Sequence, residues 1–450
     1  MSRVRPFVSV LCLLFASIAA RAAVTIDDVR LIDYRVDRTK VFVTSKGQSD
    51  SCYGIFVLVS ATDDAGRKFV GLGDALPRGL VTNETVPDAW AGAILMAAEL
   101  KGKQFGGVDK AADVKTAEDW MAALDTIAAG QKLTTRSPPP ADKQLRATLC
   151  GFDEAILDLM SQAHGVPLYE LLGGAKRQTV TVSAMTYNAD ASAEELADKA
   201  DDDGGDYGAM RLKVGLGDEE DVKKIGAVAA ELVRHKQTTQ IWVDVNQAWK
   251  SAEKSLEVLG KIRDALAASG FESTFICEQP TNEKDLPALA AVTAKVREWN
   301  KDAKFNIVIM ADEAVWTLDD AKKMVELNAA DALNIKIQKA GGLLASKRIA
   351  DFLVSKSPET AIYVGGVVAT DITSWANLQL CIALPRLDWA TSCIPRRAYK
   401  VNVSAVPVTY KVGKTLAIPA TPGLGTTLAM DKLKRYIRRD TANPATQPAN

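Results

Sequence analysis

Five charged residues recur at similar intervals in the second half of the chain, each at or near the end of a short apolar run. They are Lys213, Asp244, Glu278, Asp312 and Lys336, separated by 31, 34, 34 and 24 residues. Such intervals match one strand plus one helix in a barrel built from alternating strands and helices. Because the parallel strands of a barrel end at one rim, the pattern predicts a pocket with three carboxylates between two lysines.

Three carboxylates at one point raise each other's pKa unless a cation lies among them. A divalent ion supplies that charge, and all-oxygen ligands favour Mg²⁺, with Mn²⁺ as the second choice, over Zn²⁺. The chain has only two histidines, His164 and His235, which argues against a histidine zinc site. The pattern therefore predicts Asp244, Glu278 and Asp312 as metal ligands. The alternative is that each acid only caps the helix that follows it.

The two lysines suit acid–base chemistry at such a metal site. A partly buried lysine beside a metal ion has a lowered pKa and can act as a general base near neutral pH. Lys213 or Lys336 would remove the proton next to the carboxylate of a small substrate, and the metal ion would stabilise the enediolate. A proton returned by the other lysine gives the epimer, whereas loss of a β-leaving group gives elimination or cycloisomerisation. These residues leave both outcomes open.

The elements that must position these residues alternate between strand and helix patterns. Apolar runs bounded by turn residues predict strands, and the segments between them have helical spacing of apolar residues. The alternation predicts an α/β fold with a closed parallel barrel over residues 144–399. The predicted strands are 179–184, 209–213, 240–244, 274–278, 306–312, 332–336, 360–364 and 387–391.

Residues 23–143 have a different pattern from the barrel. Alternating apolar residues between positions 24 and 73 predict an antiparallel meander, and helical spacing follows at 89–100 and 117–127. This part is predicted to form a small α+β domain. At the other end, residues 437–450 are rich in Pro, Ala, Thr and Asn and are predicted to be a disordered tail.

The first 22 residues have the pattern of a secretory signal peptide. Arg3 and Arg5 precede an apolar run that ends at Ala20, and a small-residue site follows. The run is shorter than the roughly 20 residues that span a membrane. The pattern predicts cleavage after Ala22, export to the periplasm and no stable membrane association afterwards. The chain of 450 residues has a net charge of −1, so a nucleic-acid partner is not expected.

At these residues the chain resembles the enolase superfamily, in particular the subgroup of muconate lactonizing enzymes and dipeptide epimerases. The resemblance covers nearly all of the chain after residue 22. It implies a modified TIM barrel, (β/α)₇β, with a capping domain formed by residues 23–143 and completed by residues 400–436. The motifs that carry it are Gly71-Leu72-Gly73-Asp74-Ala75, Thr82-Asn83-Glu84-Thr85, His164-Gly165-Val166-Pro167-Leu168, Leu171-Leu172-Gly173-Gly174, Lys339-Ala340-Gly341-Gly342 and Pro422-Gly423-Leu424-Gly425.

The resemblance also implies roles for single residues. Asp244, Glu278 and Asp312 match the metal ligands, and Lys213 and Lys336 match the acid–base pair. No histidine follows Lys336, which separates the chain from the mandelate racemase branch. Three further residues fall where substrate contacts or supporting groups lie: Arg211, Asn246 and Glu313.

Three positions depart from the family pattern. Arg211 replaces the first lysine of the family's Lys-x-Lys, and Ala369 lies where the family usually has Glu-Ser. Thr391-Ser392-Cys393 lies near the place of the Asp-x-Asp found in alanyl-glutamate epimerases. The resemblance implies racemisation or epimerisation of an N-acyl amino acid or dipeptide. The alternatives are a cycloisomerase, a β-eliminating enzyme of the o-succinylbenzoate synthase kind, or an exported scaffold protein without turnover. A homo-oligomer is compatible with the sequence.

Overall fold

The computed structural model describes residues 23–106, 109–135, 138–182, 186–204, 208–367, 369–389, 391, 399–408 and 415–443. The predicted signal peptide lies outside these residues, as do Ser392 and Cys393. Within the described ranges, no helix is both long and apolar enough to cross a membrane.

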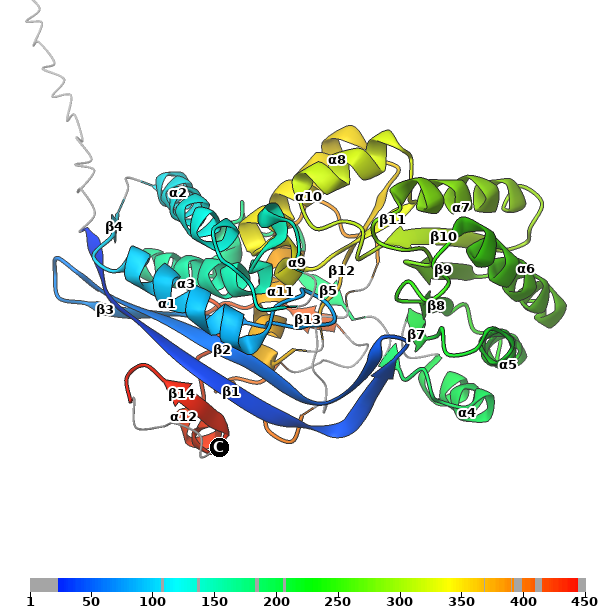
Figure 1. Cartoon of the computed structure of the whole chain (residues 1–450), viewed down its shortest axis with the longest axis horizontal. Coiled ribbons are helices and arrows are strands. Elements are labelled where there is room, and N and C mark those ends of the chain that lie inside the picture. The colour runs from blue at the N-terminus through cyan, green and yellow to red at the C-terminus, as the bar shows by residue number, and fades with distance from the viewer. Residues whose placement is uncertain are drawn as a thin grey trace, which may run out of the picture.

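The N-terminal part is built on two long antiparallel strands. β1 (Val24–Thr44) pairs with β2 (Gly47–Asp63), and β3 (Lys68–Ala75) continues the sheet. The predicted meander is confirmed, and residues 24–44 form its first strand. The pairing of β1 with β2 is interrupted between Asp37 and Phe42, and such irregularities bend a strand. In Figure 1 the hairpin curves so that its turn reaches the barrel.

The C-terminal segment returns to this sheet. β14 (Ile437–Asp440) follows α12 (Met430–Leu433) and pairs antiparallel with β1, as Figure 1 shows. Arg30 forms an ion pair of 2.6 Å with Asp440, and Arg439 forms one of 2.8 Å with Asp33. The prediction of a disordered tail from residue 437 was therefore wrong for 437–443. Its charged residues have partners about 400 positions earlier in the chain, which local composition cannot reveal.

Three helices pack on the meander: α1 (Val86–Leu100), α2 (Lys110–Ala129) and α3 (Arg146–His164). Thr85 and Asp109 cap the first two by accepting a backbone N–H three residues later. α3 is almost wholly buried, with β2 and β3 on one side and α9 (Ile337–Ala340) and α10 (Leu343–Lys356) on the other. It therefore joins the meander to the barrel.

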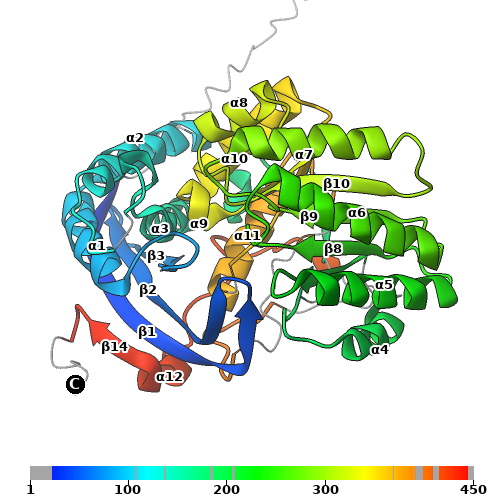
Figure 2. The same cartoon turned by 45° about the vertical axis from the view of Figure 1, so that its right-hand side comes forward.

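The barrel contains a parallel sheet whose strands pair in chain order. Predicted strands 209–213, 240–244 and 274–278 agree with the structure at both ends. Helices α4 (Ala193–Gly204), α5 (Asp218–Arg234), α6 (Ala252–Ser269), α7 (Leu286–Trp299), α8 (Leu318–Glu326) and α11 (Asp371–Ala383) alternate with the strands, and Figure 2 shows α5, α6 and α7 along strands β8 to β10. The strands are β6 (Thr186–Tyr187), β7 (Ala209–Lys213), β8 (Gln240–Asp244), β9 (Thr274–Glu278), β10 (Asn306–Ala311), β11 (Ala332–Ile335) and β12 (Ala361–Val364).

The first and last predicted barrel strands differ from the structure. β5 (Thr179–Thr181) pairs antiparallel with β13 (Thr415–Ala417), and residues 387–389 form no strand. Thr391 bridges in parallel to Val182, and its N–H donates to the Thr181 carbonyl at 2.9 Å. Two edges of the barrel thus approach through a few hydrogen bonds, where strand propensity alone predicted two full strands. The α/β barrel with an α+β cap is confirmed.

A small apolar cluster fills the barrel interior beneath the strand ends. Trp242 and Tyr363 meet edge to face with ring centroids 4.4 Å apart, and Ile276 and Met310 pack with them. These residues alternate with outward-facing ones along each strand, as barrel interiors require. The polar strand-end residues lie directly above this apolar cluster.

Candidate active site

The structure brings all five charged residues of the sequence pattern to one rim. Lys213, Asp244 and Glu278 are the last residues of β7, β8 and β9. Asp312 and Lys336 directly follow β10 and β11. The three carboxylates are 0% exposed, and the two lysines are 8% and 7% exposed. The parallel register explains this, because Asp244 pairs with Lys213 on one side and Glu278 on the other.

Each carboxylate has a cationic partner. Asp244 Oδ2 lies 2.5 Å from Lys213 Nζ and 2.6 Å from Arg211 Nη2. The same Arg211 nitrogen lies 2.5 Å from Glu278 Oε2. On the other side of the site, Lys336 Nζ lies 2.5 Å from Asp312 Oδ2. Arg211, predicted to be a substrate contact or a supporting group, therefore bridges two of the predicted metal ligands.

Three further polar residues hold the carboxylates and were missed by the sequence analysis. Trp242 Nε1 donates to Glu278 Oε2 at 2.9 Å, and Asn334 Nδ2 donates to Glu278 Oε1 at 2.6 Å. Lys339, only 1% exposed, lies 2.7 Å from Asp312 Oδ1 and also donates to backbone carbonyls. A polar residue inside an apolar strand was the available signal for Asn334. Lys339 gave no signal beyond its place in a glycine motif.

Asn246 and Glu313 connect the site to the hairpin of the cap. Lys213 Nζ donates to Asn246 Oδ1 at 3.0 Å, and Asn246 Nδ2 donates to Glu313 Oε1 at 3.2 Å. The same Glu313 oxygen accepts from Lys46 Nζ at 2.7 Å. Lys46 lies in the turn between β1 and β2. A chain of polar contacts therefore runs from the cap to Lys213.

The carboxyl groups of the site differ in pKa although all are buried. Burial opposes ionisation of Asp244, but Lys213 and Arg211 hold its pKa at about 2. Burial raises the pKa of Glu278 to about 7, although Arg211 opposes the shift. Burial would raise the pKa of Asp312, but Lys336 and Lys339 hold it well below its usual range. Charged partners therefore decide which carboxyl stays ionised.

The two lysines differ in the same way. Burial lowers the pKa of Lys213. The negative charge of Asp244 raises it, but the positive charge of Arg211 cancels part of that rise, so the pKa remains below its usual value. At Lys336 burial is outweighed by Asp312 and Glu278, so its pKa is raised. The lysine at the end of β7 gives up its proton more readily than the lysine after β11.

The donor set fits a divalent cation in ligand type. Three buried carboxylates end neighbouring strands, and the charges of Asp244 and Asp312 contribute to the raised pKa of Glu278. Hard oxygen donors of this kind bind Mg²⁺. Within the described ranges, no three His, Cys, Asp or Glu side chains already surround one point closely enough to hold an ion. The carboxylates face Arg211, Lys213 and Lys336 instead.

Two further positions depart from the family pattern, at Ala369 and at Thr391. Ala369 is 5% exposed and brings no acid to the barrel rim. Thr391 Oγ1 donates to the Val364 carbonyl at 2.5 Å, so this hydroxyl takes part in barrel closure. The Ser392-Cys393 part of that motif falls outside the described residues.

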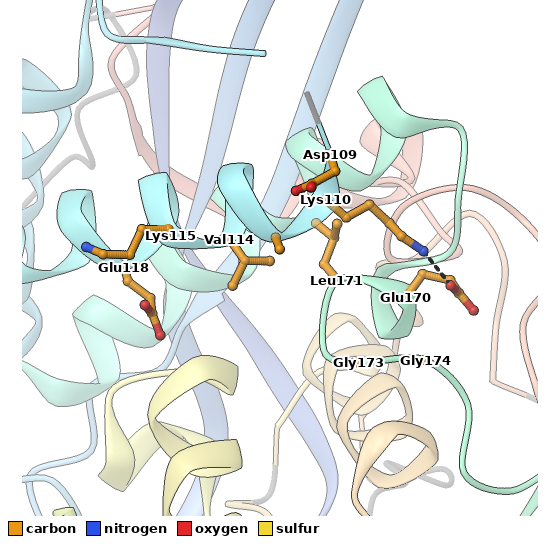
Figure 3. A pocket seen from close by; sticks show the side chains of 10 residues that line it. Asp109, Lys110, Val114, Lys115, Glu118, Glu170, Leu171, Gly173 and Gly174 are labelled. Carbon is orange, nitrogen blue, oxygen red and sulfur yellow. Dashed lines mark hydrogen bonds and ion pairs between the residues drawn. The ribbon is translucent and has the colours of Figure 1, made fainter. Parts of the chain in front are cut away.

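A separate hollow of about 550 Å³ lies away from the strand ends (Figure 3). It is bounded by the first turns of α2 and by Gly173 and Gly174. Lys110 and Glu170 form an ion pair of 2.7 Å at its edge, drawn as a dashed line in Figure 3. None of the residues predicted for chemistry lines it.

Known proteins similar in sequence to this chain include two isomerases. A chloromuconate cycloisomerase from Cupriavidus pinatubonensis is 29% identical over 289 residues, which is 64% of this chain and 72% of the relative. An L-Ala-D/L-Glu epimerase from Bacillus subtilis is 27% identical over 377 residues, covering 82% of this chain and 88% of the relative. Both are isomerases by name.

Among solved structures, an N-succinyl Arg/Lys racemase from Bacillus cereus has a similar fold. Its TM-score is 0.75 at 21% identity, covering 92% of this chain and 99% of the racemase. A dipeptide epimerase from Cytophaga hutchinsonii, solved with Mg and the dipeptide D-Ala-L-Val, has a TM-score of 0.73 at 20% identity and covers 92% of this chain and 99% of its own. Residues 191–432 match the family model described as Enolase C-terminal domain-like. With more than half of its length matched, the chain belongs to the Enolase C-terminal domain-like family.

Proposed function

We propose that this protein removes the proton next to a substrate carboxylate and returns a proton to the resulting enediolate. One observation carries the proposal: two nearly buried lysines lie on opposite sides of a barrel rim with three carboxylates between them. Lys213 ends β7 and Lys336 follows β11, so three strands separate them in the sheet. A substrate carbon held between the two lysines has one amine on each face.

The residues of this chain divide the work by their electrostatics. Lys213, whose pKa is lowered by burial, is the better base for the first proton transfer. Lys336, whose pKa is raised, stays protonated and donates its proton to the opposite face of the substrate carbon. Lys339 and Asn334 fix the carboxylates of Asp312 and Glu278 and so keep the site organised before substrate arrives.

Asp244, Glu278 and Asp312 would hold Mg²⁺, which supplies positive charge for the oxygens of the enediolate. The support is the hard oxygen donor set and the Mg present in a dipeptide epimerase of the same fold. Arg211 would remain beside the ligands and add charge for the substrate carboxylate.

We further propose racemisation or epimerisation of an N-acyl amino acid or dipeptide as the outcome. A lysine on each face is what inversion requires, and relatives of this chain include an L-Ala-D/L-Glu epimerase. Cycloisomerisation is the second candidate, because a chloromuconate cycloisomerase is similar at 29% identity. The N-terminal Arg-rich and apolar pattern supports export to the periplasm.

Incubation in D₂O with Mg²⁺ tests the proposal. A panel of L-configured dipeptides and N-acyl amino acids is followed by proton NMR and polarimetry, with an Asp244→Asn variant as control. We expect the α-proton to be replaced by deuterium with inversion in at least one substrate class, and neither to occur in the control. Ring opening or loss of a β-group without inversion would exclude the epimerase proposal and support the second candidate.

A further inference from the structure

The largest fully buried side chain in the described part of the chain is Trp242, inside the barrel. It is the Cα partner of Arg211 across β8 and β7, so the two side chains fall on one face of the sheet. The Arg211 guanidinium carbon lies 4.9 Å from the centroid of the Trp242 ring. Because Arg211 is only 5% exposed, this contact between cation and ring is shielded from water and is stronger than the same contact at a surface.

Trp242 also contacts a carboxylate that Arg211 contacts. Its Nε1 donates to Glu278 Oε2 at 2.9 Å, and Arg211 Nη2 lies 2.5 Å from the same oxygen. The same Arg211 nitrogen lies 2.6 Å from Asp244 Oδ2. Contact through one nitrogen leaves a guanidinium free to turn, whereas a ring against its face fixes its plane. Arg211, Trp242 and Glu278 therefore form a closed set of contacts in which the ring sets the orientation of the cation.

The Trp242 ring is itself held in place, whereas Arg211 needs a neighbour to hold it. The Tyr363 ring meets Trp242 at an interplanar angle of 70°, and the centroid of the Trp389 ring lies 6.5 Å from that of Trp242. Arg211 Nε is buried and has no hydrogen-bond partner among the described residues. Arginine side chains have many rotamers, so holding one geometry requires a rigid contact. The packed Trp242 ring provides that contact.

We propose that Trp242 is a positioning residue, which sets the place and the plane of the Arg211 guanidinium for the reaction. The inference rests on the proposed function, in which Arg211 adds charge for the substrate carboxylate. It also accounts for an arginine where the family pattern has a lysine, because a planar guanidinium stacks on a ring whereas an ammonium group is a compact point charge. Trp242 acts through Arg211 and Glu278 and does not itself touch the substrate.

Nitrogen-15 NMR of protein labelled at arginine reports the position of Arg211 without turnover. A proton above the face of an aromatic ring resonates upfield, and burial slows its exchange with water. The wild type should show a slowly exchanging arginine Nε–H signal shifted upfield, and the loss of this signal in Arg211→Lys assigns it. Trp242→Leu should abolish the upfield shift. Trp242→Phe, which keeps a ring at this place, should retain most of it.

A double-mutant cycle connects this position to the reaction. Trp242→Phe and Trp242→Leu both lose the hydrogen bond to Glu278, so the ratio of their kcat/KM values for α-deuterium exchange isolates the effect of the ring. We expect Trp242→Phe to exceed Trp242→Leu by about 10- to 30-fold, as for a buried contact between a cation and a ring. In an Arg211→Met background the two variants should agree within about threefold. The different cavities that Phe and Leu leave are present in both backgrounds and cancel in the cycle.

A second arginine and tryptophan pair, on the helices outside the barrel, is the matched control. The Arg263 guanidinium carbon lies 4.9 Å from the Trp299 ring centroid, the same separation as at the rim, but the Arg263 side chain is 36% exposed. Trp299→Leu should change kcat/KM less than about twofold, because a contact between cation and ring is weak at an exposed site. It should also leave the Arg211 signal where it is.

The outcomes distinguish this inference from the function on which it rests. An unshifted Arg211 signal in the wild type, or a ratio between the Phe and Leu variants that persists in Arg211→Met, would overturn the role of Trp242 while leaving α-proton exchange intact. An upfield signal that Trp242→Leu abolishes, with no exchange by the wild type, would support the placement of Arg211 by Trp242 and contradict the proposed function.

Discussion

Two groups of buried acids lie in this protein, one at the barrel rim and one around α3, and their partners differ. Every rim carboxylate contacts a lysine or arginine at 2.5 to 2.6 Å. The acids around α3 accept hydrogen bonds from backbone N–H groups. Asp153 accepts from Leu343 N at 2.6 Å, and Asp158 accepts from Leu72 N at 2.8 Å and Leu424 N at 2.6 Å.

The difference in partners appears in the pKa values of Asp244 and Asp312, which are lowered, but not in that of Glu278, which burial raises to about 7 despite Arg211. Burial raises the pKa of Asp153 to about 7 and that of Asp158 to about 6, since backbone dipoles offset it only in part. Asp244, equally buried, has a pKa of about 2 because two cations face it. The α3 acids tie β3, α10 and the C-terminal segment together. Burial of an acid alone therefore does not distinguish the two groups, and the proposed chemistry rests on the convergence of acids with cations at strand ends.

The largest expected effect comes from neutralising an acid at the rim, and the same change in an acid of α3 is the comparison. Asp244→Asn removes a proposed metal ligand and a partner of Lys213, and should lower kcat/KM by about 10³-fold or more, because metal stabilisation of the enediolate contributes several kcal/mol. Asp158→Asn keeps an oxygen acceptor and should change kcat/KM less than about threefold in the fraction that folds. Mg²⁺ titration calorimetry should show binding lost only in the first variant. Comparable losses in both variants would erase the distinction between the two groups.

Replacing either lysine of the rim should remove proton transfer on one face of the substrate. Lys213→Ala and Lys336→Ala should each slow inversion by about 10²- to 10⁴-fold, the usual contribution of a general acid or base. Deuterium exchange measured separately from L and D substrates should show that each variant fails mainly with one enantiomer. Equal loss for both enantiomers in both variants would contradict the two-face arrangement. Lys347→Ala, which changes a partly buried lysine outside the rim that pairs with Asp351, is the control.

The α3 acids predict how stability depends on pH. The pKa of Asp153 is about 7 in the folded chain, against about 4 for an unfolded aspartate. The folded state holds this proton more tightly, so its contribution is complete below about pH 4 and is lost as pH rises through about 7. The wild type should melt at a lower temperature at pH 8 than at pH 5. Asp153→Asn, which stays neutral, should show a smaller difference.

Calorimetric melting at both pH values measures this effect, expected to be on the order of a few kcal/mol. Asp119→Asn, at an exposed position paired with Lys115, is the matched control and should melt like the wild type at both pH values. An unchanged pH dependence in Asp153→Asn would mean that the aspartate is ionised in the folded state. The contrast between the two groups of acids would then be lost.

The smallest expected effect tests the link between the cap and the rim. Lys46→Met leaves the 4% exposed Glu313 without its lysine partner and loosens Asn246, which contacts Lys213. We expect kcat to fall about tenfold with little change in KM, as for loss of one charged hydrogen bond. Lys46→Arg should restore most of kcat. The exposed Lys40→Met is the control, and a pure rise in KM would instead make Lys46 a substrate contact.

Much of this arrangement was predictable because it repeats locally. The intervals between Lys213, Asp244, Glu278, Asp312 and Lys336 follow the length of a strand plus a helix, and three predicted strands agreed with the structure at both ends. Strand ends of a parallel barrel must share a rim, so the residue type at each end was enough to predict the pocket. The sequence did not predict the short strand at Thr186–Tyr187 or the contacts at Thr391, because both depend on barrel closure.

The sequence by itself determined the alternation of strands and helices and the five charged strand ends, since both follow from local periodicity. Only the tertiary structure decided which cation meets which acid. Arg211 bridges Asp244 and Glu278, Lys46 reaches Glu313 across 267 positions, and the C-terminal strand returns to β1. Such contacts depend on where distant segments pack, and electrostatic free energies change steeply with distance and burial. The acidity of each buried group was therefore fixed by the fold.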